Sequence, residues 1–303
     1  MKIVIAGGSG FLGRALTAAL IGGGHDVVIL SRAGRHGPGG RARAVAWSPT
    51  GDTGSWASEV NGAGAVINLA GESIAGRRWS AAHKARILDS RVNATRSLVA
   101  GIRAAAAPPA VFVSGSAVGY YGPRGDEPVT ETDPAGSDFL ARVCVQWEEE
   151  ALRAGVAATR VVLVRTGLVL ARDGGALPEM LPPFRFGGGG PVGSGRQYWP
   201  WIHRDDWVGL VLWAAANPAV SGAVNATAPN PVTNKDFAAS LGRAMHRPSF
   251  MPAPALALRL LLGEMADALL LSGQRALPAQ AQRLGFTFRF ADVDAALGEI
   301  FSA

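Results

Sequence analysis

The sequence predicts an α/β protein in which a doubly wound parallel sheet is joined to a smaller, largely helical C-terminal region. A buried strand at the start of the chain runs directly into a glycine-rich turn and a helix. Short β-type runs then alternate with helical patterns, a rhythm typical of βαβ units. With 303 residues, 48% of them hydrophobic, the chain can bury the core that such a fold needs.

The expected elements follow one another in a regular order. Strands are expected at Lys2–Ala6, Asp26–Leu30, Ala65–Asn68, Ala110–Ser114 and Arg160–Val164. Helices are expected at Phe11–Ile21, at about Ser80–Ala105, and at Phe139–Ala154 and Trp207–Ala216. The last helix follows Asp205 and Asp206, whose carboxylates can cap its free amides.

From Gly174 onward, prolines and glycines predict a long irregular segment that includes Pro182, Pro183 and residues 187–195. The glycines leave the backbone free and few side chains can anchor it, so we expect 187–195 to be a mobile lid over ligand. Charged residues interrupt the apolar stretch Ala255–Leu271, which predicts two core helices and not a membrane span.

Composition excludes several classes of function. The net charge is +6, but the basic residues are scattered, so we expect no nucleic-acid partner. The single cysteine, Cys144, excludes an intrachain disulfide, and the N-terminus does not resemble a signal peptide, so we expect a cytoplasmic protein. The five histidines show no metal-binding spacing, so no metal site is expected.

The strongest functional signal is the run from Gly7 to Gly13, which reads G-x-x-G-x-x-G between a strand and a helix. Gly7 permits the tight turn, Gly10 lets the backbone approach a pyrophosphate, and Gly13 allows close packing of helix and sheet. The helix N-terminus offers free amides and the positive end of its dipole to phosphates. The run therefore predicts a dinucleotide bound to a Rossmann-type sheet.

The end of the second strand indicates which dinucleotide. An acidic residue there would accept hydrogen bonds from the ribose hydroxyls of NAD. This strand ends in Leu30, Ser31 and Arg32, with Arg35 close behind. A guanidinium suits a 2′-phosphate, so we expect NADP(H) as the cofactor.

Further motifs carry a resemblance to a known family. They are Asn68–Gly71, Val92–Thr95, Ser114–Ser116 leading to Tyr120-Tyr121-Gly122, Arg165-Thr166-Gly167 and Trp201–Asp206. With the glycine turn, they resemble the extended short-chain dehydrogenase/reductases. Narrower motifs resemble an atypical subgroup, the "epimerase family" or NAD-dependent epimerase/dehydratase-like proteins: Asn68–Glu72, Arg78-Trp79, Ser116–Gly122, Leu181–Phe184, Gly193–Gln197 and Gly273–Pro278.

The resemblance covers essentially the whole chain and implies two parts. Residues 1–170, with 200–230 returning to them, are expected to form the NADP-binding Rossmann domain. Residues 171–199 and 231–303 are expected to form the substrate side, with a small C-terminal domain at about 248–290. A homodimer is a possible assembly.

The cofactor set combines the glycine turn, the second strand and the matched motifs. Its members are Gly7, Gly10, Phe11, Leu12, Gly13, Ser31, Arg32, Asn68, Leu69, Ala70, Gly71 and Ser114. The resemblance also assigns Ser116 to the serine that hydrogen-bonds the reacting oxygen.

The matched helix lacks the family's Tyr-x-x-x-Lys relay. In the family, the lysine lowers the pKa of the tyrosine and holds the nicotinamide ribose, and the tyrosine transfers the proton. Here Leu140 and Cys144, or Phe139 and Val143, occupy those places. An ordinary Tyr/Lys relay is therefore not available.

Replacement candidates are few. Tyr120, Tyr121 and His203 are candidates for proton transfer, against purely structural roles for each. Cys144 lies among apolar neighbours and is expected to be an inert buried thiol. Glu72 and Arg78 follow a strand at its carboxyl end, where ligands bind, and are expected to contact substrate unless they form a surface ion pair.

Two classes of function fit these observations. The first is an NADP-dependent oxidoreductase or epimerase that acts on an unidentified small molecule with a modified relay. The second is a non-catalytic NADP(H)-binding sensor or regulatory protein. The retained Ser116 favours the first and the missing tyrosine and lysine favour the second; we favour the enzyme.

Overall fold

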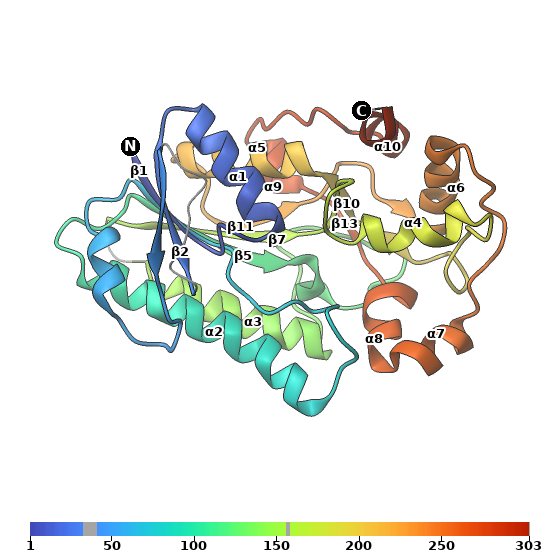
Figure 1. Ribbon diagram of the computed structural model, residues 1–303, viewed down its shortest axis with the longest axis horizontal. Helices are drawn as coiled ribbons and strands as arrows, with labels where there is room; N and C mark the ends of the chain where they lie inside the picture. The colour runs from blue at the N-terminus through green and yellow to red at the C-terminus, as the bar shows by residue number, and fades with distance from the viewer. Residues whose placement is uncertain (33–40, 156–157, 303) are drawn as a thin grey trace.

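The protein folds into three layers, with a parallel sheet between two layers of helices (Figure 1). The computed structural model describes residues 1–32, 41–155 and 158–302. Seven parallel strands form the sheet in the order β11-β7-β5-β4-β1-β2-β3. They are β1 (Lys2–Ala6), β2 (Asp26–Ser31), β3 (Ala42–Ala46), β4 (Ala65–Asn68), β5 (Val111–Ala117), β7 (Arg160–Thr166) and β11 (Gly222–Ala226). The predicted α/β fold with a doubly wound parallel sheet is confirmed.

Helices cover both faces because the strands send apolar side chains alternately to two cores. Ile3 and Ile5 of β1 face one core, whereas Val4 and Ala6 face the other. The helices α1 (Phe11–Gly22) and α5 (Arg204–Ala216) close the first core. The helices α2 (Ala81–Ala104) and α3 (Phe139–Leu152) close the second, on the opposite face (Figure 1).

The order of the strands reverses beside β1, with β2 on one side and β4 on the other. Ligands of doubly wound sheets bind in the crevice outside the carboxyl ends of the strands at such a point. The glycine turn follows β1 directly, and the segment that begins at Leu69 follows β4. Two parts of the predicted cofactor set therefore flank this crevice.

A second group of elements lies beyond the carboxyl ends of the strands, on the right in Figure 1. It contains α4 (Leu177–Arg185), α6 (Asn234–Met245), α7 (Ala255–Leu262) and α8 (Glu264–Ala266), and α10 (Val293–Ser302) packs on α6. Leu181, Phe237 and Leu297 meet in a third apolar core. This core joins α4, α6 and α10 and includes Trp201, which lies in a short strand outside the main sheet.

Short elements join the two groups. The strands β8 (Leu168–Leu170) and β10 (Trp201–His203) pair in parallel, as do β6 (Pro128–Val129) and β13 (Arg275–Ala276), whereas β9 (Tyr198–Trp199) and β12 (Val232–Thr233) pair antiparallel. The remaining elements are η1 (Ser55–Glu59), η2 (Val118–Tyr121), η3 (Asp267–Leu271) and α9 (Ala279–Arg283).

Part of the segment that we expected to be irregular is the helix α4, so that expectation is wrong for Leu177–Arg185. Pro182 and Pro183 lie inside this helix, at a cost of about 3 kcal/mol each for proline in a helix interior. Leu177, Leu181 and Phe184 are buried in the third core. Burial of such side chains is worth about 1.5–3 kcal/mol each, which offsets the proline cost.

Residues 187–195 are anchored by their backbone, which the sequence did not suggest. The Gly193 amide donates to the Ala253 carbonyl at 2.9 Å, and the Met251 amide donates to the Gly189 carbonyl at 3.0 Å. The Val192 amide also donates to Oδ1 of Asn234 at 2.6 Å. The expectation that little anchors this segment is wrong, and its role as a lid stays a prediction.

Two expectations about helices are also wrong. The first part of the stretch 255–271 is α7, in which no residue is buried, so it is not a core helix. The helix α5 begins at Arg204, and its cap is His203, whose Nδ1 accepts from the Asp205 amide at 3.1 Å. The Asp206 carboxylate instead accepts from the backbone amides of residues 289 and 290, at 2.8 Å each.

Candidate active site at the carboxyl edge of the sheet

The glycine turn has two positions that the fold itself requires to be glycine. Gly7 has a φ of +83°, and a Cβ there would lie 2.7 Å from the carbonyl carbon of Leu69. A Cβ on Gly13 would lie 2.2 Å from the carbonyl oxygen of Gly7. Both glycines are needed to close the turn between β1 and α1.

Gly10 differs, because the fold leaves room for a side chain there. Its backbone is extended, with a φ of −75°, and a Cβ would have one neighbour within 4 Å among the described residues, the Gly7 carbonyl oxygen at 3.3 Å. Gly10 is the N-cap of α1, and no side chain caps that end. An open glycine beside uncapped amides is the surface that a phosphate group needs.

The end of β2 carries no acidic residue. Arg32 is exposed, and it makes no hydrogen bond or ion pair with the residues that the structure describes. Ser31 is held through its backbone carbonyl, which accepts from the Trp47 amide at 3.1 Å. Arg35, which we grouped with Arg32, lies outside the described residues.

The segment after β4 is shaped by a buried asparagine. Asn68 is fully buried, and its Nδ2 donates to the Thr95 hydroxyl at 2.9 Å. Its Oδ1 accepts from the Ala70 amide at 3.2 Å, which sets the bend that brings Leu69 against Gly7. Asn68 therefore supports the crevice through the backbone, and the fully buried Ser114 does not present its side chain there either.

Ser116 is joined to a buried ion pair. Its hydroxyl lies 2.5 Å from Oε1 of Glu148 on α3, and Glu148 binds Arg165 of β7 through two hydrogen bonds of 2.9 and 2.8 Å. All three residues are buried. An ionised carboxylate can only accept, so Ser116 donates its proton to Glu148. Toward a ligand, the Ser116 oxygen is left as an acceptor and not as the donor that we expected.

Arg165 keeps its charge in this setting. Burial by itself lowers the pKa of Arg165, but the hydrogen bonds and the charge of Glu148 outweigh it and raise the pKa above its ordinary value. Its guanidinium also lies 3.4 Å from the ring centre of Tyr120, a close cation–π contact. A permanent cation is thus fixed beneath one of the two candidate tyrosines.

The two neighbouring tyrosines have opposite surroundings. Tyr121 is fully buried, donates to Oδ1 of Asn225 at 2.7 Å and accepts from Arg165 at 3.0 Å. Burial raises the pKa of Tyr121 to about 12, so its phenol stays protonated at neutral pH. Tyr120 is half-buried, and its hydroxyl makes no hydrogen bond within the described part of the chain. Tyr120 therefore has a free phenol for proton transfer, and Tyr121 does not.

His203 is not joined to this cluster. Its Nδ1 caps α5, its Nε2 lies 3.1 Å from the carboxylate of Glu299 on α10, and its ring lies 4.1 Å from that of Phe290. Both ring nitrogens are thus engaged, Nδ1 within the start of α5 and Nε2 with the C-terminal helix. The structure brings together Ser116, Tyr120 and Tyr121 through Arg165, and it places His203 elsewhere.

The predicted substrate residues lie on the loop between β4 and α2. Glu72 is half-buried and is held by its amide, which donates to the Ser90 hydroxyl at 2.9 Å. Arg78 is exposed, and its Nε would lie 3.1 Å from a Cβ on Gly263, so it packs against the junction of α7 and α8. The two residues form no ion pair with each other. Contact with substrate stays a prediction for both.

Cys144 has the character of an inert thiol. It is buried, and its sulfur lies 3.7 Å from the Ala117 carbonyl. Burial raises the pKa of Cys144 to about 12, so the thiol is neutral at physiological pH.

Three charged residues at this edge were given no site role from the sequence: Arg91, Glu148 and Arg165, although Arg165 belongs to a matched motif. A signal was present for two of them. Glu148 lies four residues after Cys144 on the apolar face of its helix, and Arg165 follows four apolar residues in a strand. Charged side chains at positions that periodicity marks as buried are seldom left unpaired, so each could have been predicted to have a partner.

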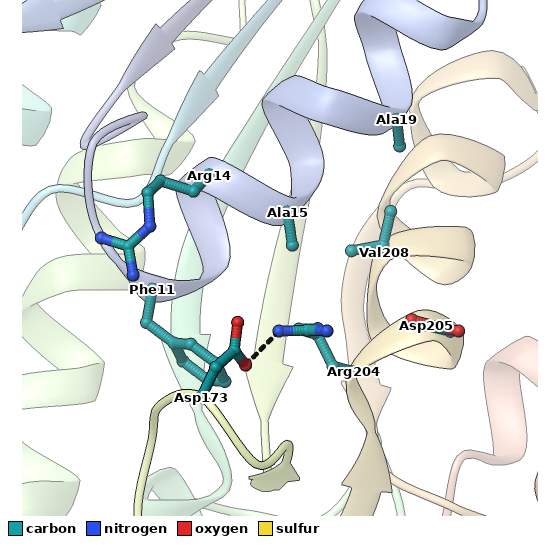
Figure 2. Close-up of a pocket in the computed structure, with 8 residues that line it drawn as sticks. All are labelled: Phe11, Arg14, Ala15, Ala19, Asp173, Arg204, Asp205 and Val208. Atoms are coloured by element: carbon teal, nitrogen blue, oxygen red, sulfur yellow. Dashed lines mark hydrogen bonds and ion pairs between the residues drawn. The ribbon is translucent and has the colours of Figure 1, made fainter. Parts of the chain in front are cut away.

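A separate pocket of about 500 Å³ opens between α1 and α5 (Figure 2). Its lining includes Phe11, Arg14 and Val208, and Arg204 and Asp173, which also line it, form an ion pair. Phe11 is its one member from the predicted cofactor set, and none of the candidate catalytic residues lines it. Because no candidate catalytic residue lines this pocket, we do not assign the reaction to it.

Membrane-spanning helices and metal-binding clusters are both absent from the described residues. Across residues 1–32, 41–155 and 158–302, no helix combines the length and apolar character needed to cross a bilayer. In the same residues, no three His, Cys, Asp or Glu side chains are grouped so that they could hold a metal ion.

Comparison with known proteins places this geometry in a family. The NAD dependent epimerase/dehydratase family matches residues 3–226, and a domain of unknown function, DUF1731, matches residues 253–300. The chain is 43% identical to epimerase family protein ML0860 of Mycobacterium leprae, over 97% of this chain and 94% of that one. It is 38% identical to the epimerase family protein SDR39U1 of Homo sapiens, over 99% of both chains.

A solved structure agrees with these matches. The crystal structure of human epimerase family protein SDR39U1 (isoform2) with NADPH superposes with a TM-score of 0.90. It is 36% identical, and the match covers 100% of this chain and 99% of that one. Together with the glycine turn and the parallel sheet, these matches show that the chain belongs to the NAD dependent epimerase/dehydratase family.

Proposed function

We propose that this protein is an NADP(H)-dependent oxidoreductase or epimerase of a small molecule, an atypical short-chain dehydrogenase/reductase in which Tyr120 transfers the proton. The observation that carries cofactor binding is Gly10, an open glycine at the uncapped N-terminus of α1. Arg32 at the end of β2 supports NADP(H) over NAD(H). The human relative that was solved with NADPH supports the same choice.

The proton-transfer proposal depends on which polar atoms are free. The hydroxyl proton of Ser116, the hydroxyl of Tyr121 and both ring nitrogens of His203 are engaged within the protein. The Tyr120 hydroxyl makes no hydrogen bond with any residue that the structure describes, and its ring lies over Arg165. The guanidinium would stabilise the phenolate that forms when Tyr120 gives its proton to a substrate oxygen.

The roles of the remaining residues follow from this arrangement. Bound NADP(H) supplies or accepts the hydride. Ser116, with its proton held by Glu148, can accept a hydrogen bond from a substrate hydroxyl and so orient it. Glu148 and Arg165 position Ser116 and Tyr120, and water restores the Tyr120 proton after transfer.

A pair of tyrosine variants tests the proposal. A panel of carbonyl compounds is first screened for oxidation of NADPH by the unmutated protein. With a working substrate, Tyr120→Phe should lower kcat by about 100-fold or more, because a positioned acid is worth 10²–10⁴-fold. NADPH affinity should not change. Cys144→Ala is the matched control, because it removes a buried thiol that is neutral. Its kcat should stay within about threefold of that of the unmutated protein.

A second candidate function is a non-catalytic NADP(H) sensor, favoured by the satisfied hydrogen bonds of Ser116 and Tyr121. It becomes the better account if NADPH binds but no carbonyl is reduced, and if Tyr120→Phe alters only ligand affinity. A cytoplasmic location and a homodimer are part of the proposal as well. Cell fractionation and sedimentation velocity check them.

A further inference from the structure

The second group of elements carries an exposed apolar surface, which we call the α7 patch. Among the described residues, eight large hydrophobic side chains are exposed, and six of them belong to this patch. The six are Phe186, Phe250, Met251, Leu256, Leu260 and Leu261. The other two, Met1 and Leu152, lie singly, at the start of the chain and at the end of α3. Single exposed apolar residues are ordinary, whereas a contiguous apolar patch marks an interaction surface.

Backbone contacts bring the parts of the α7 patch to one end of the molecule. The Met251 amide donates to the Gly189 carbonyl at 3.0 Å, and a Cβ on Gly188 would lie 3.8 Å from the Met251 sulfur. Gly188 lies two residues after Phe186, the C-cap of α4, so Met251 lies beside the end of that helix. Four residues after Met251 the chain enters α7, which lies at the same end of the molecule (Figure 1).

The helix α7 presents its leucines to solvent. Leu256 and Leu260 are four residues apart, so they form a ridge along one face of the helix. Both of them and Leu261 are at least 70% exposed, and Leu258 and Leu262 are only half-buried. A helix of eight residues is marginal in water unless its apolar face packs against another surface. The exposed ridge of α7 is therefore a face that a partner would cover.

The area of the α7 patch is that of a standard protein interface. Phe186 is 90% exposed, Phe250 75% and Met251 52%. At about 200 Å² for a fully exposed side chain of this size, the six side chains together expose about 850 Å². The largest apolar patch on a typical monomer is about 300–600 Å², whereas each partner in a stable complex buries about 800 Å². The patch is thus large enough for a stable dimer.

The charges near the α7 patch favour a protein partner over a lipid surface. Arg185 and Arg247, which are close to the patch in the chain, are exposed and form no ion pair with the described residues. Arg259 on α7 is neutralised by Asp267 at 2.8 Å. Recruitment to anionic lipid typically takes a cluster of about four to eight basic residues, more than the patch offers. Most soluble oligomers are symmetric homo-oligomers, so the partner that fits this surface best is a second copy of the chain.

We propose that the α7 patch is the interface of a symmetric dimer, in which it packs against the same patch of a second copy. In a twofold dimer each surface meets its own copy, so the ridge of Leu256 and Leu260 packs beside the same ridge of the partner. The proposal rests on the homodimer of the proposed function and names its surface. It is independent of the cofactor, because none of the six residues belongs to the candidate active site.

Sedimentation velocity of the cofactor-free protein tests the proposal. The unmutated protein should be a dimer at micromolar concentration. The double variant Leu256→Glu with Leu260→Glu should be a monomer, with the dissociation constant of the dimer raised by at least about 100-fold, because unpaired carboxylates would be buried and each substitution occurs twice. Its circular dichroism spectrum should not change, since both leucines are exposed within one chain.

A control variant and a second measurement separate the α7 patch from the rest of the surface. Leu152→Glu is the matched control, because Leu152 is an exposed leucine outside the patch, and this variant should stay dimeric. Cross-linking avoids the introduced charges. In the Cys144→Ala background, which has no other thiol, Leu256→Cys should give a covalent dimer with a short bismaleimide. Leu152→Cys should give none.

Two results would overturn the proposal. One is a dimer that persists in the double variant and cross-links no better through Leu256→Cys than through Leu152→Cys. The other is an unmutated protein that stays monomeric at high micromolar concentration. If that monomer sediments with phosphatidylserine-containing vesicles and the double variant does not, the patch is a lipid-docking surface instead. A dimer that forms through the patch in a protein that fails to bind NADPH would remove the proposed cofactor and support this proposal.

Discussion

At the scale of single residues, the three positions of the turn are occupied by glycine for different physical reasons. A side chain at Gly7 or Gly13 collides with the backbone of the protein itself, whereas a side chain at Gly10 meets little. The sequence pattern alone could not separate them, because all three match the same motif. The separation gives a sharp test of whether the turn serves a ligand.

Gly10→Val should lower NADPH affinity by at least about 100-fold, because the side chain would displace phosphate from two or more amides. The free energy of unfolding should change by about 1 kcal/mol or less, since the backbone at Gly10 is already extended. Gly13→Val, the matched control, should lose several kcal/mol of stability, because its side chain overlaps Gly7. Urea unfolding and calorimetry measure both, and retained binding by Gly10→Val would show that the turn is only structural.

Tyr121 predicts a loss of stability in alkaline solution. Its pKa rises from about 10 in the unfolded chain to about 12 in the folded protein, because burial disfavours the phenolate. Its contribution is fully present below about pH 10, and it falls as the pH rises toward 12. The expected loss is about 3 kcal/mol across that window.

Urea unfolding between about pH 8 and pH 11.5 measures this loss. Burial raises the pKa of Cys144 in the same sense, so the comparison is made in the Cys144→Ala background. In that background, Tyr121→Phe should remove most of the alkaline decline. An equal decline with and without Tyr121 would contradict the assignment.

At the scale of elements, the sequence predicted those whose periodicity agrees with their burial. The strand Lys2–Ala6 was found because it is apolar throughout, and α3 because its apolar face repeats at helical spacing and begins at the capping residue Asp138. The strand β3 was missed because Arg43 and Ala46 are exposed at the edge of the sheet. The helix α4 was missed because two prolines oppose the burial that forms it.

The same limit applies to the candidate site. The shape of the glycine turn was predicted, because the motif itself encodes it, and binding through its backbone stays a prediction. Ser116 was located, but the direction of its hydrogen bond was not, because it depends on Glu148 from a distant helix. Arg91 gave no signal, since a single arginine on a polar helix is ordinary.

The structure changes the expectation from the sequence most for the segment 187–195. Because the amides of Val192 and Gly193 are hydrogen-bonded without cofactor, they should exchange slowly with deuterium in the cofactor-free protein. Asn234→Ala should increase exchange at Val192, whereas Asn230→Ala, whose side chain bonds at the Ala291 carbonyl, should not. Rapid exchange at both amides in the unmutated protein, with protection only after NADPH is added, would contradict this expectation and support a mobile lid that orders over the cofactor.

At the scale of the whole molecule, the C-terminal region is built into the wall behind the tyrosines. The strand β13 pairs with β6, and Nε2 of Gln274 donates to the Val118 carbonyl at 2.6 Å. Asn225, which accepts from Tyr121, donates in turn to the Leu277 carbonyl at 2.9 Å. The region matched by the domain of unknown function therefore supports the candidate site and is not a detachable tail.

The central claim concerns the cofactor of the whole protein, and its most direct test is the relative affinity for NADPH and NADH. Calorimetry on the unmutated protein should give tighter binding of NADPH, and Arg32→Ala should reduce that preference by about 10- to 100-fold. Arg41→Ala is the matched control, because Arg41 is an exposed arginine at the opposite end of the sheet that binds the Gly24 carbonyl. It should leave the preference unchanged. Equal affinities of the unmutated protein for NADPH and NADH would contradict the account.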